Sequence, residues 1–76
     1  MSIYVLRYGD LYKIGFSSDL QKRVCAIMHG IPGEVHFVGH MPGGQEVETH
    51  LHEVFAASRF SGEWFRATPD LEAFCK

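Results

Sequence analysis

The residues best suited to chemistry lie in the segment 45–57. It contains two pairs of an acid and a histidine at a spacing of four residues, Glu46 with His50 and Glu48 with His52. Residues four apart lie on the same face of a helix, so each pair places a carboxylate beside an imidazole. A carboxylate is a hard ligand that suits a mostly hydrated magnesium ion. The spacing alone does not choose between the two pairs.

Histidine and cysteine do not form a zinc-binding pattern in this chain. His50 and His52 are two residues apart, so on a helix they diverge by about 200° and cannot bind one ion together. Cys25 and Cys75 have no C-x-x-C spacing, and we expect two reduced thiols, with Cys25 packed inside its helix. Surface or strand-edge positions are expected for the remaining histidines, His29, His36 and His40.

The N-terminal part of the chain contains the phenol and the cations that could act with these carboxylates. Two apolar and aromatic runs flank a Gly9-Asp10 turn, which predicts a β-hairpin over residues 3–8 and 11–16. A helix over residues 19–29 is predicted next, because apolar residues recur there at the spacing of a buried helical stripe. The hairpin and this helix are therefore the elements that must position those groups.

Side chains alternate between the two faces of a strand, and this decides which hairpin residues reach a common cleft. Lys13 and Gly15 share one face, whereas Tyr12 is expected to pack into the core. Tyr4 lies on the first strand, and Arg23 lies about one turn inside the following helix. A free tyrosine has a pKa near 10, so Tyr4 needs a perturbing neighbour such as Lys13 before it can act as a base.

The remainder of the chain completes a small α+β domain. A single domain is expected over residues 1–76, because a chain of this length has no room for a second core. We predict a short, mainly antiparallel sheet of three strands, with a further edge strand allowed, packed with three helices. The segments predicted after the first helix are a strand at 34–40, a loop at 41–44, a helix at 45–57, a connection at 59–62, a short strand or extended tail at 63–66, and a helix at 69–75.

Several short motifs follow one another along the chain. In order they are Ile3-Tyr4, Tyr12-Lys13-Ile14-Gly15, Arg23, Glu48-x-x-Leu51-His52-x-x-Phe55 and Gly62-Glu63-Trp64-Phe65. The ordered set resembles the GIY-YIG nuclease superfamily over residues 2–66, and its second half is similar to a compact phage and bacterial branch. The chain departs from the superfamily pattern because it has no asparagine. Glu63 or Arg59 takes the place of that residue, or the position is lost.

The resemblance implies a metal-dependent DNA endonuclease that hydrolyses phosphodiester bonds. It selects Glu48 of the two acids as the ligand of a single Mg²⁺ or Mn²⁺ ion. Tyr4 would activate or position the attacking water, while Arg23 and Lys13 would stabilise the phosphate. His52 would orient the carboxylate or touch the scissile phosphate, or else only support the cleft. The contacts to DNA that the resemblance implies come from Lys13, Gly15, Lys22, Arg23 and Arg59.

The net charge of the chain argues against high affinity for DNA. Seven Lys and Arg stand against nine Asp and Glu, for a formal charge of −2, whereas affinity for DNA comes largely from neutralised phosphates. Two other functions therefore stay open, a DNA-binding module without useful catalysis and a small phage-type regulatory interaction protein. A homodimer or a targeting protein partner could supply the missing affinity for DNA. Otherwise the contacts to DNA would come from a local cluster of cations, drawn from Arg7, Lys13, Lys22, Arg23, Arg59 and Arg66.

No membrane association is expected for this chain. Its apolar runs are all shorter than the roughly 18 residues that a membrane span requires, and no basic and apolar leader is present. We therefore expect a cytoplasmic protein.

Overall fold

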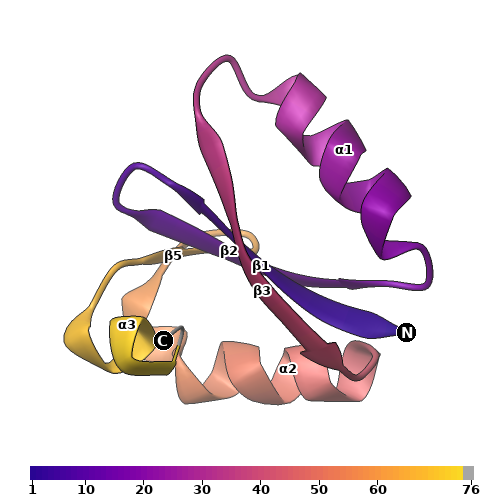
Figure 1. The fold of residues 1–76 in the computed structure, drawn as a ribbon. Helices are drawn as coiled ribbons and strands as arrows, with labels where there is room; N and C mark the ends of the chain where they lie inside the picture. Colours follow the sequence, from indigo (N-terminus) through magenta and orange to yellow (C-terminus); the bar gives the residue numbers. More distant parts are fainter. Residues whose placement is uncertain (75–76) are drawn as a thin grey trace.

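The structure is a computed structural model, and it describes residues 1–74 of the chain. One antiparallel sheet lies in the middle, with helix α1 (Leu20–Gly30) on one face and helices α2 (Gln45–Val54) and α3 (Pro69–Phe74) on the other (Figure 1). The order of the strands is β3-β1-β2-β5-β4. The predicted α+β class with three helices is confirmed. Within the described part, no helix is long and apolar enough to cross a membrane.

The predicted N-terminal hairpin is confirmed, and it forms the centre of the sheet. Strand β1 (Ser2–Tyr8) pairs with strand β2 (Leu11–Ser17) over its whole length. Gly9 turns the chain with a φ of 59°, a left-handed conformation that a residue without a side chain adopts at little cost. Helix α1 begins where the side chain of Asp19 accepts a hydrogen bond of 3.2 Å from the backbone N–H of Lys22.

Strand β3 (Val35–Pro42) lies at one edge of the sheet and is longer than predicted. It pairs with β1 as far as Ser2 opposite Pro42, so Met41 and Pro42 belong to the strand and not to a loop. Proline is tolerated there because an edge strand has one side free of ladder hydrogen bonds. The pairing register shifts once, which leaves Val38 without a partner as a β-bulge.

Two further strands extend the sheet; one confirms the short strand that was allowed at 63–66, and the other was not predicted. Strand β4 (Arg59–Ser61) occupies the segment expected to be a connection, and β5 (Trp64–Arg66) joins it to β2. Each has three residues, too few for an alternating pattern to identify a strand. Gly62 makes the turn between them with a φ of 56°. A 3₁₀ turn at Ala56–Ser58 follows α2, so this helix ends before the predicted residue 57.

Two apolar clusters join the helices to the sheet, one on each face. Tyr12 is 4% exposed, which confirms its predicted place in the core. Cys25 is exposed, and the prediction that it packs inside its helix was wrong, because α1 turns only the side that contains Val24 towards the sheet. The cluster beneath α1 consists of Tyr4, Leu6 and Val24. The cluster beneath α2 and α3 consists of Ile3, Val5, Tyr12, Ile14, Leu51, Phe55, Phe65 and Leu71.

Candidate functional site

Half of strand β2 has no neighbouring strand on one side, and helix α2 covers that gap. Strand β5 pairs with β2 only over residues 11–13. Beyond it, the backbone N–H of Ile14 donates to the carbonyl of Glu63 at 3.1 Å, and Nε2 of His52 lies 3.0 Å from the carbonyl oxygen of Ile14. A carbonyl only accepts, so His52 donates this bond. The bond holds α2 beside β2 and brings Glu48, one turn earlier, to the same edge.

Tyr4 and Gly15 lie opposite each other in the pairing of β1 with β2. The tyrosine is 0% exposed, and its phenol passes over the glycine. A Cβ on Gly15 would overlap the end of the Tyr4 ring and would lie 3.0 Å from Oε2 of Glu63. Because the φ of Gly15 is not positive, the position requires glycine for space and not for backbone conformation. The phenol from β1 and the carboxylate from the β4–β5 turn therefore meet above this one residue.

Two buried oxygen atoms at this position, Tyr4 Oη and Glu63 Oε2, have no hydrogen-bond partner among the described residues. Lys13 Nζ lies 3.2 Å from the Glu63 oxygen and forms an ion pair without hydrogen-bond geometry. The same ammonium lies over the ring of Trp64, 5.3 Å from its centroid. Buried polar atoms are nearly always paired in folded proteins, so two such atoms side by side indicate a place for a ligand, an ion or a water.

Charged groups from different elements act on one another at this position. Burial raises the pKa of Tyr4, the nearby Arg23 guanidinium lowers it, and the negative charges of Glu63 and Glu48 raise it. The phenol therefore stays protonated at neutral pH. Burial also raises the pKa of Glu48, Glu63 adds to this rise, and His52 opposes it. The predicted phenol, guanidinium and carboxylate thus lie close together, although they come from β1, α1 and α2.

In a comparison with protein families, a model of the T5orf172 domain matches residues 1–73. The chain belongs to the T5orf172 domain family. This phage-associated family is linked with endonuclease-like proteins and suggests a nuclease or DNA-binding role. No curated protein and no solved structure matches the chain.

The two acid–histidine pairs of this T5orf172 domain differ in their surroundings. Glu46 and His50 are exposed, whereas Glu48 and His52 are half-buried against the sheet. The ring of His52 also packs against Phe65, with 5.0 Å between the ring centroids. Only the second pair therefore lies at the site. Since Nε2 of His52 is bonded to the backbone, the observed contacts of this histidine are those of a residue that supports the cleft.

Two of the cations predicted to contact DNA lie outside the group of interacting charges. Arg59 is exposed, and its Nε donates to the carbonyl of Gly62 at 2.8 Å, which stabilises the turn of the β4–β5 hairpin. Lys22 is exposed on α1 beside Arg23. Of the two residues that the sequence offered, it is therefore the side chain of Glu63, and not that of Arg59, that lies beside Tyr4 and Gly15. The sequence signal for Glu63 was Gly62, the residue before it, because the turn at Gly62 directs the Glu63 side chain inward.

The donor atoms present suit a hydrated magnesium ion better than zinc. Among residues 1–74, no group of three or more His, Cys, Asp or Glu is arranged to hold a metal ion, which is the arrangement that protein zinc sites use. Magnesium takes one or two carboxylates and keeps several waters. The carboxylates of Glu48 and Glu63, next to the partnerless Tyr4 Oη, fit such an ion.

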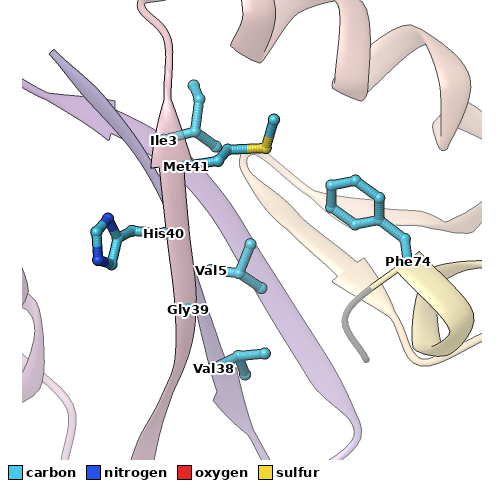
Figure 2. A pocket seen from close by; sticks show the side chains of 7 residues that line it. All are labelled: Ile3, Val5, Val38, Gly39, His40, Met41 and Phe74. Atoms are coloured by element: carbon cyan, nitrogen blue, oxygen red, sulfur yellow. The ribbon is translucent and has the colours of Figure 1, made fainter.

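Two hollows formed by the described residues lie elsewhere and are lined mainly by apolar side chains. One of about 240 Å³ lies between β3 and α3, where Phe74 faces the sheet and His40 points to the opposite side of the strand (Figure 2). Another lies at the far end of the hairpin, beside Tyr8 and Trp64. Neither is lined by the interacting charged groups. The first is lined by Ile3, Val5, Val38, Gly39, His40, Met41 and Phe74.

Proposed function

We propose that this T5orf172 domain is a metal-dependent endonuclease that hydrolyses phosphodiester bonds of DNA, as GIY-YIG nucleases do. The observation that carries the proposal is that Arg23 and Glu48 act on the Tyr4 phenol, which lies over Gly15. Phosphodiester hydrolysis needs a positioned water, fixed positive charge on the phosphate and stabilisation of the leaving oxygen. Gly15 is buried beneath the Tyr4 phenol, so we do not expect it to contact DNA directly.

Glu48 would hold a Mg²⁺ or Mn²⁺ ion at this site. Its carboxylate is half-buried, and the burial that raises its pKa also means that water competes less for it than for an exposed acid. A bound ion would act as a Lewis acid towards the phosphate and the leaving oxygen. Magnesium retains most of its waters in protein sites, so the small number of protein ligands is compatible with this ion.

The side chains of the site divide the remaining tasks. Arg23 is exposed on α1 next to the Tyr4 phenol, and its guanidinium fork suits two phosphate oxygens. Lys13 adds a point charge on the adjacent strand. The raised pKa of Tyr4 favours a phenol that orients the attacking water over one that removes its proton. His52 would act through Glu48, because its bond to the Ile14 carbonyl fixes α2.

A plasmid assay tests this proposal. The protein should nick supercoiled DNA in Mg²⁺ or Mn²⁺ and not in EDTA. Glu48→Gln keeps the shape of the side chain and removes its charge, so the rate should fall at least about a hundredfold. Glu46→Gln is the matched control, because Glu46 is exposed on the same helix. Equal rates for the two variants would contradict the assignment of Glu48.

A DNA-binding module without catalysis is the second candidate. It is favoured by the formal charge of −2 and by the ion pair that occupies Lys13. Binding to DNA that weakens with salt, without metal-dependent products, would support this function and exclude the nuclease.

A further inference from the structure

Glu63 reaches the site from a part of the chain that forms its own hairpin. Gly62 turns the chain with a φ of 56°, and the carbonyl of Glu63 then accepts a hydrogen bond from Ile14 of β2. The turn and this hydrogen bond fix the backbone of Glu63 against the sheet. One carboxylate oxygen is buried without a hydrogen-bond partner, although the side chain as a whole is 35% exposed. A carboxylate oxygen that is fixed and buried without a hydrogen-bond partner is free to bind a further ligand, such as a cation or a water.

The partnerless oxygen of Glu63 does not stand alone. It lies 3.0 Å from the point where a Cβ of Gly15 would be, and the phenol of Tyr4 overlaps the same point. Tyr4 Oη is buried and also lacks a hydrogen-bond partner in the described chain. The negative charge of Glu48 is close enough to act on both Tyr4 and Arg23. Tyr4 of β1 and Glu63 of the β4–β5 turn therefore meet at one position, and Glu48 of α2 lies near enough for its charge to act on both Tyr4 and Glu63.

Lys13 and Arg23 match the two carboxylates in formal charge, but neither forms a hydrogen bond with the buried oxygen of Glu63. Lys13 Nζ approaches Glu63 Oε2 at 3.2 Å, without hydrogen-bond geometry. Arg23 acts on the phenol more than on either carboxylate. A doubly charged cation would neutralise both acids and provide the missing partner for the buried oxygen.

We propose that Glu63 is a second carboxylate ligand of the site and that Glu48 and Glu63 together hold the divalent cation. The inference rests on the proposed function for the presence of a cation, and adds a ligand that GIY-YIG-like motifs do not assign. When no divalent cation is bound, the Lys13 ammonium pairs with Glu63, and it therefore competes with the cation for this carboxylate. Two carboxylates and retained waters are the ligands that magnesium favours.

Binding of Mn²⁺ to the protein alone, measured by electron paramagnetic resonance and calorimetry, tests the inference without DNA or cleavage. The wild type should bind one Mn²⁺. Glu63→Gln and Glu48→Gln should each weaken the affinity at least about tenfold, and the exposed control Glu46→Gln should bind like the wild type. Full affinity in Glu63→Gln, with loss in Glu48→Gln, would overturn this inference and leave the proposed function standing. Full affinity in both variants would overturn the metal assignment of the proposed function as well.

A double-mutant cycle with Lys13 covers the case in which Glu63→Gln disturbs the fold. Lys13→Met removes the charge and keeps an apolar chain beside Trp64. It should tighten Mn²⁺ binding about three- to tenfold, because the competing ammonium is gone. In the Glu63→Gln background the gain should be much smaller. The same gain in both backgrounds would show that Lys13 acts on Glu48 alone, and this result would overturn the inference. Circular dichroism of each variant checks its fold.

Discussion

The Tyr4 hydroxyl is expected to contribute to activity and not to stability. Tyr4→Phe removes a buried oxygen that has no partner in the described chain. The free energy of unfolding in urea should stay equal or rise by up to about 1 kcal/mol, because an unsatisfied polar group costs free energy when buried. Nicking in magnesium should fall at least about tenfold. Tyr8→Phe, at an exposed tyrosine of the same strand, should change neither. A loss of stability in Tyr4→Phe would mean that the hydroxyl is bonded.

Gly15 and Gly39 are both strand glycines, but only Gly15 lacks room for a side chain. A methyl group on Gly15 would meet the Tyr4 ring and Glu63, whereas no atom lies within 4 Å of the same position on Gly39. Gly15→Ala should therefore lower the free energy of unfolding by about 1–3 kcal/mol and reduce nicking. Gly39→Ala should be neutral or stabilising by up to about 1 kcal/mol. Urea denaturation measures both, and equal effects would contradict the close packing at Gly15.

The carboxyl of Glu48 should make stability depend on pH. Burial and Glu63 raise its pKa above the ordinary value of 4.5, so the folded protein binds this proton more tightly than the unfolded chain. The contribution to stability is complete below the unfolded pKa and is lost as pH rises through the folded pKa. The difference in unfolding free energy between wild type and Glu48→Gln, measured in EDTA from about pH 4 to pH 7, should therefore become less favourable to the wild type with rising pH. A flat difference would contradict the shift.

At the scale of elements, the connection between α2 and β2 depends on His52. The side chain donates to the Ile14 carbonyl at 3.0 Å and packs against Phe65. His52→Ala leaves that carbonyl without a partner, so the free energy of unfolding should fall by about 1–2 kcal/mol. His50→Ala, at an exposed histidine of the same helix, should stay within about 0.5 kcal/mol of the wild type. Equal losses would show that helix propensity, and not this contact, decides the effect.

The elements that were predicted correctly are those whose patterns extend over several turns or alternations. The hairpin of β1 and β2 and the helices α1 and α2 each have 7 to 11 residues, enough for a period to stand out. Strands β4 and β5 have three residues each. Strand β4 pairs with β5, and β5 pairs with β2; no local pattern shows these pairings, so β5 was predicted only as one of two alternatives and β4 was missed. The extension of β3 to Pro42 likewise depends on pairing with β1.

The candidate site was predictable in its residue types and not in its contacts. The alternation of strand residues identified Gly15 and Lys13 as neighbours on one face, which their common approach to the Glu63 carboxylate bears out. The choice between Glu63 and Arg59 needed the conformation of the turn at Gly62. The bond between His52 and Ile14 joins residues 38 positions apart, a distance over which side-chain spacing carries no information.

At the scale of the whole molecule, the cations are divided between the two faces of the sheet. Arg7 lies on the face of α2 and α3, where its guanidinium donates to Gly9 and to the Tyr12 hydroxyl. Arg23 and Lys22 lie on α1, on the opposite face. The chain has a formal charge of −2. Among the described residues, the cations near Tyr4 are Arg23 on α1, with Lys22 next to it in the chain, and Lys13 on β2, while Arg59 and Arg66 are exposed on β4 and β5.

This distribution sets the expected response of DNA binding to salt. Each neutralised phosphate contributes about −0.9 to the slope of log affinity against log salt, so one chain should give a slope between about −1 and −3. Arg23→Gln should make the slope shallower by about one unit, and Arg7→Gln should leave it unchanged. Fluorescence anisotropy with a labelled duplex in EDTA measures the slopes. A wild-type slope steeper than about −5 would contradict binding by one chain, because the charges of a single α1 face cannot neutralise so many phosphates.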